Sequence, residues 1–316
     1  MKINTVTGSI ETSGLGPTLM HEHVCCADWS MRMNFEDRFF EFDKTVETAA
    51  AMLTKVKLEC GVTTVVDGTP INLGRDVRLL RAVAERTGLR IIASSGFYYQ
   101  EEPGLAFYSE EKLADLLLGE CLNGIDGTDI LPGIMKAAVE TGGVTPYVSK
   151  ILTAVGSAAA KSGLPVFCHH NPHHKNGGEI LDVFESQGVA LNRVILGHSG
   201  DTDDLSYLEA MLKRGCYIGM DRFAYCDMTL SLERRAAAIA ALCEKGYGSR
   251  MLLSHDLVVS GFFGGDGDNA AKPEAQSPDF TFIHKKALPA LLAAGMTQGQ
   301  FDKIIVENPK NFFEGK

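Results

Sequence analysis

The sequence lacks the features that mark membrane proteins, secreted proteins and proteins that bind polyanions. No stretch approaches the roughly 18 consecutive apolar residues of a membrane-spanning helix, and the polar, glycine-rich N-terminal residues contain no apolar signal core. Basic residues are too few to balance the acidic ones, with 30 Lys and Arg against 40 Asp and Glu and a net charge of −10. Nucleic acids and anionic membranes select basic surfaces, so we expect neither as a partner.

Cysteine is present, but without the spacing of a redox or zinc motif. None of the eight cysteines belongs to a CxxC pair, and several, such as Cys168 and Cys216, lie inside apolar runs. This pattern is typical of small, reduced core residues in a cytoplasmic protein. The adjacent Cys25 and Cys26 leave open a pair of thiol ligands.

Eight short apolar runs alternate with helix-length segments along the chain. Because the runs lack clean polar alternation, they suit parallel strands that are covered on both faces. The sequence contains neither GxGxxG nor GxxxxGK[ST], which argues against the competing doubly wound sheet. We therefore predict an α/β fold, a (β/α)8 TIM barrel that forms a single domain over residues 1–316. The predicted strands are 16–20, 62–67, 90–94, 130–136, 165–169, 193–198, 215–221 and 250–256.

Glycines and amphipathic patterns place several helices between these strands. Segments 43–60 and 75–87 each precede a glycine, Gly61 or Gly88, that can stop a helix. Two further helical stretches, 282–294 and 298–306, close the chain, and a terminal helix on the barrel exterior would account for Phe312 and Phe313.

The longest loop candidate is the segment 259–279, which follows the eighth predicted strand and is rich in glycine and aspartate. Barrels carry their active sites on the face where this loop emerges, so a mobile lid is one interpretation. A plain surface excursion is the other, and the residues do not decide between them.

The most informative stretch is His21-Glu22-His23, which follows an apolar run opened by Gly16-Pro17. Side chains at i and i+2 of a strand share a face, so both imidazoles point the same way. Two converging imidazoles begin a zinc-type site. On its own, however, the motif favours two half-buried histidines that hydrogen-bond to carbonyl groups.

Other predicted strands also end in residues that can bind a metal ion. Since parallel strands of a barrel end on one rim, we expect these residues to gather there. Hydrophobic cores do not place imidazoles, an amine and a carboxylate at so many strand ends, so their joint occurrence predicts a metal centre. The six residues are His21, His23, Lys136, His169, His198 and Asp256.

Lys136 needs a separate explanation, because an ammonium group has no lone pair to donate to a metal. Burial beside cations would lower its pKa and free the amine. A free amine can react with carbon dioxide to give a carbamate, whose two oxygens can bridge two metal ions. A lysine that holds a substrate carboxylate or phosphate, or that reaches solvent, is an equal alternative at this point.

The chain resembles the phosphotriesterase-like family of the amidohydrolase superfamily, which includes the phosphotriesterase-like lactonases. The resemblance covers nearly the whole chain. The motifs that carry it are Thr18-Leu19-Met20-His21-Glu22-His23, Gly133-Ile134-Met135-Lys136, Gly197-His198-Ser199-Gly200-Asp201-Thr202-Asp203-Asp204, Ser254-His255-Asp256 and Glu307-Asn308-Pro309.

The resemblance implies a binuclear metal centre. One ion, more buried, would be bound by His21, His23 and Asp256, and a more exposed one by His169 and His198. A carboxylated Lys136 and a hydroxide would bridge the two ions. Zinc is the default metal, and such sites also accept manganese, cobalt or iron.

The resemblance also implies roles in the reaction. The bridging hydroxide attacks the substrate, and Asp256 acts as general base and passes the proton to the leaving oxygen. Asp201 lies three residues after His198, where family members have a carboxylate that assists this proton shuttle. An N-cap of the helix predicted at 204–214 is the alternative for Asp201, and Asp203 can also fill that position.

Substrate preference depends on two residues and one loop. Arg222 and Tyr98 lie where the lactonases of the family have arginine and tyrosine, and where phosphotriesterases have histidine and tryptophan. A guanidinium and a phenol suit a polar ester or lactone, although either residue can instead belong to a polar rim. The loop after the fifth strand contains His170, His173, His174 and Lys175, which either bind an anionic group or form a solvated loop.

We therefore predict a hydrolase of lactones or related carboxylic esters, such as sugar lactones or their phosphates, with phosphotriester hydrolysis as a side activity. An amide or N-acyl hydrolase on the same metal centre is the alternative, and a non-catalytic ligand-binding barrel is a third. The partner is a small-molecule substrate, and the resemblance implies a homodimer. The sequence does not identify the physiological substrate or the metal.

Overall fold

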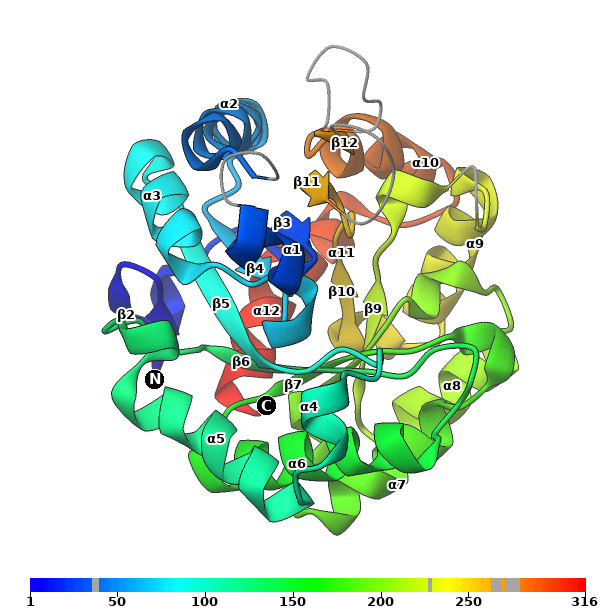
Figure 1. Cartoon of the computed structure of the whole chain (residues 1–316). Coiled ribbons are helices and arrows are strands. Elements are labelled where there is room, and N and C mark those ends of the chain that lie inside the picture. The colour runs from blue at the N-terminus through cyan, green and yellow to red at the C-terminus, as the bar shows by residue number, and fades with distance from the viewer. Residues whose placement is uncertain (36–39, 227–228, 263–268, 271–278) are drawn as a thin grey trace.

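A computed structural model describes residues 1–35, 40–226, 229–262, 269–270 and 279–316 of the chain. Its parallel strands curl into an α/β barrel enclosed by helices, as predicted (Figure 1). A short antiparallel hairpin, β1 (Lys2–Thr5) and β2 (Gly8–Glu11), precedes the barrel. The parallel strands are β3 (Thr18–Ala27), β4 (Thr64–Asp67), β5 (Arg90–Gly96), β6 (Ile134–Ala138), β7 (Val166–His169), β8 (Val194–Gly197), β9 (Tyr217–Met220), β10 (Met251–Leu253) and β11 (Val258–Phe262).

The eighth strand position of the barrel is shared by β10 and β11. β10 pairs with β9, β11 pairs with β3, and the link 254–257 between them joins the two edges of the sheet. Within this link, the Asp256 amide donates to the His21 carbonyl, and the Leu257 carbonyl accepts from the His23 amide. The prediction of one continuous strand over 250–256 is therefore wrong, because the chain turns at Asp256, where φ is 57°.

The loop predicted at 259–279 is also partly wrong, since its first residues belong to β11. Residues 269–270 form a short strand, β12 (Asn269–Ala270), that pairs antiparallel with β11. The remainder of the segment, 263–268 and 271–278, lies outside the described residues, and with it the proposed lid.

Helices follow the strands and form the outer ring (Figure 1). The two helices expected from their glycine stops are confirmed, and Gly61 and Gly88 cap them with φ of 72° and 65°. The ring helices are α2 (Phe42–Cys60), α3 (Val77–Thr87), α5 (Glu110–Asn123), α6 (Pro146–Ser162), α7 (Gly177–Ser186), α8 (Leu205–Lys213), α9 (Leu232–Glu244) and α10 (Leu288–Ala293). Shorter helices are α1 (Trp29–Phe35), α4 (Pro103–Ala106), α11 (Gln298–Asp302) and α12 (Asn308–Glu314), with π-helical turns at Ile283–Ala287 and Lys303–Glu307.

The first barrel strand is longer than predicted, so His21 and His23 lie inside β3 and not at its end. β3 continues to Ala27 because β11 pairs with its second half, from His23 to Ala27. On the other side, the register with β4 shifts between Leu19 and Glu22, which marks a bulge at the position of His21. Bulges redirect side chains, and here the irregularity coincides with the first candidate ligand.

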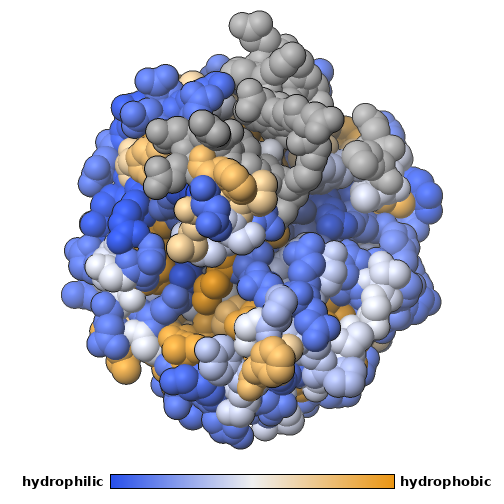
Figure 2. Space-filling view, in the orientation of Figure 1, coloured by the Kyte–Doolittle hydropathy of each residue, from blue (hydrophilic) through white to orange (hydrophobic). Residues whose placement is uncertain are grey.

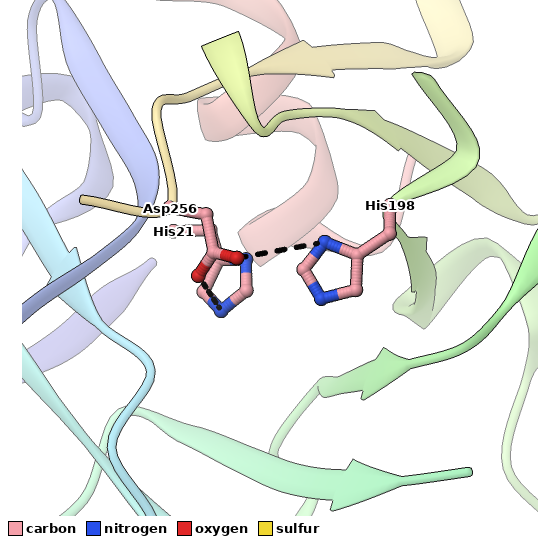
Figure 3. A group of neighbouring side chains, drawn as sticks. All are labelled: His21, His198 and Asp256. Atoms are coloured by element: carbon pink, nitrogen blue, oxygen red, sulfur yellow. Dashed lines mark ion pairs between the residues drawn. The ribbon is translucent and has the colours of Figure 1, made fainter. Parts of the chain in front are cut away.

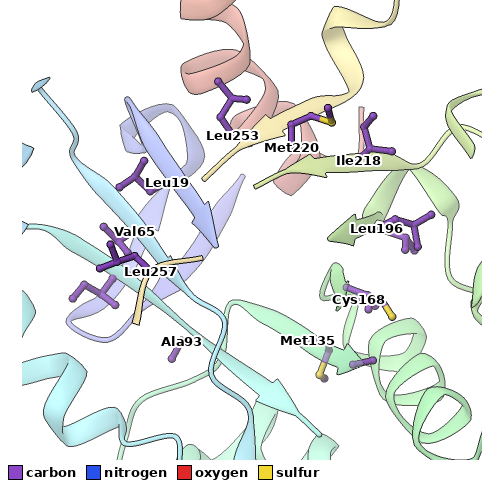
Figure 4. Close-up of a cluster of buried hydrophobic side chains, with 14 of the residues drawn as sticks. Leu19, Val65, Ala93, Met135, Cys168, Leu196, Ile218, Met220, Leu253 and Leu257 are labelled. Carbon is purple, nitrogen blue, oxygen red and sulfur yellow. The ribbon is translucent and has the colours of Figure 1, made fainter. Parts of the chain in front are cut away.

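Between the strands and the ring helices lies the larger hydrophobic core. It is built from strand residues that point away from the barrel axis and from the inner faces of the helices. Figure 4 shows ten of these residues by name, among them Leu19, Val65, Met135, Leu196 and Leu253. Cys25 and Cys168 belong to this core, and none of the eight cysteines, all of which lie in the described part of the chain, forms a disulfide.

A second, smaller core fills the barrel interior, and the C-terminal helix α12 closes it. Phe312 and Phe313 pack with inward-facing residues such as Met20, Phe167 and Tyr217. The expectation that these phenylalanines lie on the barrel exterior is therefore wrong, and α12 is seen through the centre of the ring in Figure 1. They seal the end of the barrel opposite to the carboxyl ends of the strands.

Replacing Phe312 with alanine should destabilise the protein by about 3–5 kcal/mol, the usual cost of emptying a buried phenylalanine site. Phe312 is fully buried, and its ring meets that of Tyr217 edge to face, with centroids 5.3 Å apart. Denaturant unfolding at constant metal concentration measures the loss. Phe107→Ala, at a side chain that is 89% exposed, is the control. Equal stability of the two variants would show that α12 does not seal the barrel.

None of the described helices is both long and apolar enough to cross a bilayer. Apolar side chains do gather on the face shown in Figure 2, over the short helix α1. Trp29, Met31, Met33 and Phe35 are all more than one-third exposed there.

Candidate metal centre

The six predicted ligand residues come together on the barrel axis, and five of them are almost completely buried. His21 and His23 come from β3, Lys136 from β6 and His169 from the end of β7. His198 directly follows β8. The sixth residue, Asp256, lies in the link between β10 and β11 with 13% of its side chain exposed.

Three residues of this region adopt the left-handed backbone conformation, which is unusual for residues other than glycine. His198, Arg222 and Asp256 have φ of 60°, 60° and 57°. They follow the carboxyl ends of β8, β9 and β10, respectively. Such strain is retained where the surrounding structure enforces it, and it concentrates at functional sites.

His21, His23 and Asp256 present three donor atoms to one point. The Nε2 atoms of the two histidines are 3.2 Å apart. Oδ1 of Asp256 lies 3.4 Å from Nε2 of His21 and 3.2 Å from Nε2 of His23. Figure 3 shows the ion pairs that join Asp256 to His21 and to His198, whose Nδ1 is 3.8 Å from Oδ2 of Asp256.

His169 and His198 form a second pair, with Nδ1 of His169 only 2.7 Å from Nε2 of His198. Lys136 lies on the side of His21, with 2.8 Å between its Nζ and Nε2 of that histidine. The ammonium also faces the ring of Phe167, 4.3 Å from its centroid. Gly68 leaves room for this arrangement, because a Cβ there would lie 2.6 Å from His21 and 3.4 Å from the Lys136 nitrogen.

The second nitrogen of each histidine is held by a hydrogen-bond partner. Nδ1 of His23 lies 2.8 Å from the Thr69 hydroxyl, and Nε2 of His169 lies 2.9 Å from Glu140. One carboxylate, Asp221, meets Nδ1 of both His21 and His198 at 3.0 Å. Acceptors at these nitrogens fix the tautomer and leave the inward nitrogen with a free lone pair.

This donor set fits divalent cations. Ligand atoms at zinc distances in a tetrahedral site are about 3.3 Å apart, close to the spacing among His21, His23 and Asp256. His21, His198 and Asp256 each offer a ligand atom within 4.8 Å of the others. Imidazole nitrogens and a carboxylate oxygen are the ligands that zinc and similar metals prefer.

Burial keeps most of these imidazoles neutral, as metal ligation requires. It lowers the pKa of His21 to about 4, and it lowers the pKa values of His169 and His198 as well. His23 differs: burial acts in the same direction, but Cys26 and Asp256 raise its pKa to about 10. Without a cation, therefore, a protonated His23 pairs with the Asp256 carboxylate, and a metal ion would replace that proton.

Lys136 is 1% exposed, which rules out the interpretation that its amine reaches solvent. Burial lowers the pKa of the ammonium to about 8, against the opposing effect of Asp256 and Asp221. At pH 7 about a tenth of the amine is then unprotonated, far more than for an ordinary lysine. This is the form that can take up carbon dioxide.

Asp201 does not cap a helix. The N-cap of α8 is Asp204, whose side chain accepts from the Tyr207 amide. Asp201 instead lies between two arginines, with Oδ2 at 2.8 Å from Arg222 and Oδ1 at 3.0 Å from the fully buried Arg235. Arg222 in turn reaches Oδ2 of Asp256 at 3.2 Å, so it connects the two carboxylates.

Tyr98 also reaches the centre, since its hydroxyl is 3.2 Å from Nδ1 of His169. The loop after β7 contributes less than its composition indicated. His170 is buried and is bonded to the Gly197 carbonyl and the Tyr207 hydroxyl. Lys175 forms an ion pair with Asp204, which supports the interpretation of a polar surface loop for this segment.

Four polar residues that hold the ligands or their partners were not predicted from the sequence: Thr69, Asp221, Glu140 and Arg235. Asp221 was detectable, because it is the last residue of the predicted strand 215–221, and most of the ligands also end predicted strands. Glu140 lies two residues after β6, and Arg235 lies on α9. No pattern in the sequence marks either of them.

Comparison with known proteins gives consistent matches over the full length. The model of the family described as "Phosphotriesterase family" matches residues 1–313. The chain is 34% identical to the "Phosphotriesterase homology protein" of Mycobacterium tuberculosis, over 99% of this chain and 98% of the other. It is 31% identical to the "Aryldialkylphosphatase" of Saccharolobus solfataricus, with 96% and 97% covered.

Two further matches complete the comparison. The solved structure of the phosphotriesterase from Mycobacterium tuberculosis has a TM-score of 0.91 and 34% identity, with 99% of this chain and 98% of the other covered. The "N-acetyltaurine hydrolase" of Rattus norvegicus is 28% identical over the whole chain and 98% of its own length.

Proposed function

The chain belongs to the phosphotriesterase family, and on that premise we propose that it hydrolyses lactones or related carboxylic esters at a binuclear metal centre. The family and the relatives support a metal-dependent hydrolase. The more specific part of the proposal is the preference for carboxylic esters over amides and phosphotriesters. This preference depends on the residues beside the metal ligands.

His21, His23 and Asp256 would hold one cation and His169 with His198 the other, and we propose a carbamate on Lys136 as a ligand shared by both. Zinc is the first choice of metal. When bound, two such ions polarise the ester carbonyl and bring the pKa of water close to neutrality. Supporting this, the donor atoms converge, and burial leaves the Lys136 amine with a pKa of about 8.

Asp256 is placed to move the proton in the reaction. Its carboxylate contacts His21 and His23 through Oδ1 and Arg222 through Oδ2. It can accept the proton of the attacking water and return it to the leaving oxygen. Arg222 holds this carboxylate in place, and Asp201 anchors Arg222 from the other side.

Tyr98 is the observation that carries the ester preference. Burial, then Asp256, raises the pKa of its hydroxyl well above the ordinary value, so the group remains a hydrogen-bond donor at neutral pH. The hydroxyl lies 3.2 Å from His169, beside the centre. A protonated phenol there suits the polar oxygen of an ester or lactone. The phenol offers little to the apolar substituents of a phosphotriester. We therefore propose phosphotriester hydrolysis only as a side activity.

Acidic side chains line a cavity near Tyr98. A cavity of about 450 Å³ adjoins Tyr98 through Asn72, whose side chain accepts from the Tyr98 amide. Asp28, Glu101 and Glu102 line this cavity, and burial together with Asp28 raises the pKa of Glu102. The Arg222 charge is taken up by two carboxylates. The carboxylates of the cavity would repel an anionic group bound within it, but the residues that line it include none of the six proposed ligands.

The second candidate function is hydrolysis of an N-acyl amide. It is favoured by the full-length similarity to the rat protein named N-acetyltaurine hydrolase. The same metal ligands and Asp256 would serve amide cleavage, because both reactions pass through an anionic tetrahedral intermediate. We place this function second because the rat relative is less similar to this chain, at 28% identity, than the two phosphotriesterase relatives, at 34% and 31%.

A substrate panel distinguishes the candidates. Metal-loaded protein is assayed with neutral lactones and aryl esters by proton release, with N-acetyltaurine by amine release, and with a phosphotriester by phenol release. We expect kcat/KM for the best lactone to exceed that for N-acetyltaurine by about tenfold or more. Faster amide cleavage would establish the second function. A fully loaded protein with no turnover would indicate a ligand-binding barrel.

A further inference from the structure

Asp221 holds one histidine of each proposed metal position at the same time. Oδ2 of Asp221 lies 3.0 Å from Nδ1 of His21, and Oδ1 lies 3.0 Å from Nδ1 of His198. The same Oδ1 accepts from the His198 amide at 2.8 Å. Among the residues that hold the outer nitrogens of the ligand histidines, Thr69 and Glu140 each hold one, and Asp221 holds two.

The Asp221 carboxylate has little freedom to serve the two histidines independently. It is 1% exposed, and its backbone carbonyl accepts from the buried Arg235 guanidinium. Gly219 packs so closely that a Cβ there would lie 3.0 Å from Oδ2. Because the carboxylate is planar, a rotation that improves the contact with His21 also moves the oxygen that faces His198.

We propose that Asp221 is a positioning residue that makes the two metal positions cooperative. A cation on His21 orients that imidazole and fixes the carboxylate plane, which then holds His198 in the orientation its own cation needs. The coupling is reciprocal, as linkage requires. The proposal rests on the proposed function, because it presupposes two bound metal ions.

The variant Asp221→Asn separates coupled from independent positions. An amide has one oxygen, and the two hydrogen bonds of His198 favour keeping it at the Oδ1 position. The amide nitrogen then faces Nδ1 of His21 and disfavours the tautomer that frees Nε2 for a metal. Independent positions would lose affinity at His21 alone, whereas coupled positions lose affinity at both.

The experiment uses the full chain loaded with Co²⁺ and equilibrated against a series of chelator concentrations, with the bound metal counted by elemental analysis. We expect Asp221→Asn to raise the dissociation constant of the His21 position about 10–100-fold. The other constant should rise about fivefold or more through the lost coupling. The matched control is Glu140→Gln, which also neutralises a carboxylate but contacts His169 as its one ligand histidine among the described residues, so one constant should stay at its wild-type value.

Failure of the inference differs from failure of the proposed function. Wild-type protein that binds fewer than two ions contradicts the binuclear centre itself. Wild-type protein that binds two, with Asp221→Asn leaving one constant unchanged, contradicts the coupling alone.

If Asp221→Asn does not fold, native mass spectrometry of partly loaded Lys136→Ala protein decides, because the shared carbamate of the wild type would couple the two ions by itself. Coupling predicts that doubly loaded and empty chains dominate. A large singly loaded population would overturn it.

Discussion

Replacing Lys136 with alanine should lower kcat/KM for the best substrate by at least about 10³-fold and reduce the bound metal. The lysine lies 2.8 Å from Nε2 of His21 in a pocket that excludes solvent. As a carbamate it would supply two oxygens to the centre, and their loss removes several kcal/mol of charge stabilisation, at 1.36 kcal/mol for each tenfold change. Steady-state kinetics and elemental analysis of the purified variant measure both effects.

The carbamate has a signature that other roles of Lys136 lack. Removing the side chain leaves a buried space beside His21, and a short carboxylic acid such as acetate can supply the missing oxygens there. Partial recovery of turnover with increasing acetate or propionate is expected in Lys136→Ala and absent in the wild type. Lys161→Ala, an exposed lysine on α6, should behave as wild type. A Lys136→Ala protein with full activity and two bound metals would refute the assignment.

The positions of the candidate ligands could be predicted because they depend only on where each strand ends. In a barrel of parallel strands, residues at the carboxyl ends of strands share one rim. The apolar runs were enough to place His169, His198 and Lys136 there, even where strand bounds were off by a few residues. The predicted run 130–136, for example, contains a strand that begins only at Ile134, yet Lys136 lies in that strand as expected.

The contacts of the residues that hold the ligands could not be predicted in the same way, even for Asp221, whose place at a strand end was detectable. Asp221 meets His21 across 200 residues, and Arg235 meets Asp201 across 34. Such contacts form only when the barrel closes, and no periodic pattern in the sequence indicates them. The split of the eighth strand at Asp256 has the same origin, since the turn is stabilised by bonds to His21 and His23 of β3.

The same reasoning explains why α12 was misplaced. Its pair of phenylalanines reads as one apolar face of a terminal helix, which fits either the outside of the barrel or its open end. Only the small interior cluster around Met20 and Phe167 shows that the open end needs a cover. The barrel thus keeps its two ends distinct, with an apolar seal at one end and the polar centre at the other.

The second large effect is expected for Asp256→Asn, which should lower kcat by about 10²–10⁴-fold, the usual contribution of a positioned general base. The Asp256 carboxylate contacts His21, His23 and Arg222, and burial, outweighed by His21, His198 and His23, leaves its pKa well below the ordinary value. An amide keeps the shape but cannot accept the proton of water. Among the described residues, it also leaves Asp201 as the one carboxylate in an ion pair with Arg222.

The loss in Asp256→Asn has two separable causes, ligation and proton transfer. Elemental analysis at saturating Co²⁺ shows whether both ions still bind. If they do, the remaining fall in kcat reports proton transfer. We expect KM to change little in this variant, because the substitution should leave substrate binding almost unaffected. Asp203→Asn is the matched control, since Asp203 is exposed and pairs only with Arg234 on the surface among the contacts described for it. An Asp256→Asn enzyme within tenfold of wild-type kcat would show that another group, with Asp201 the nearest carboxylate across Arg222, takes the proton.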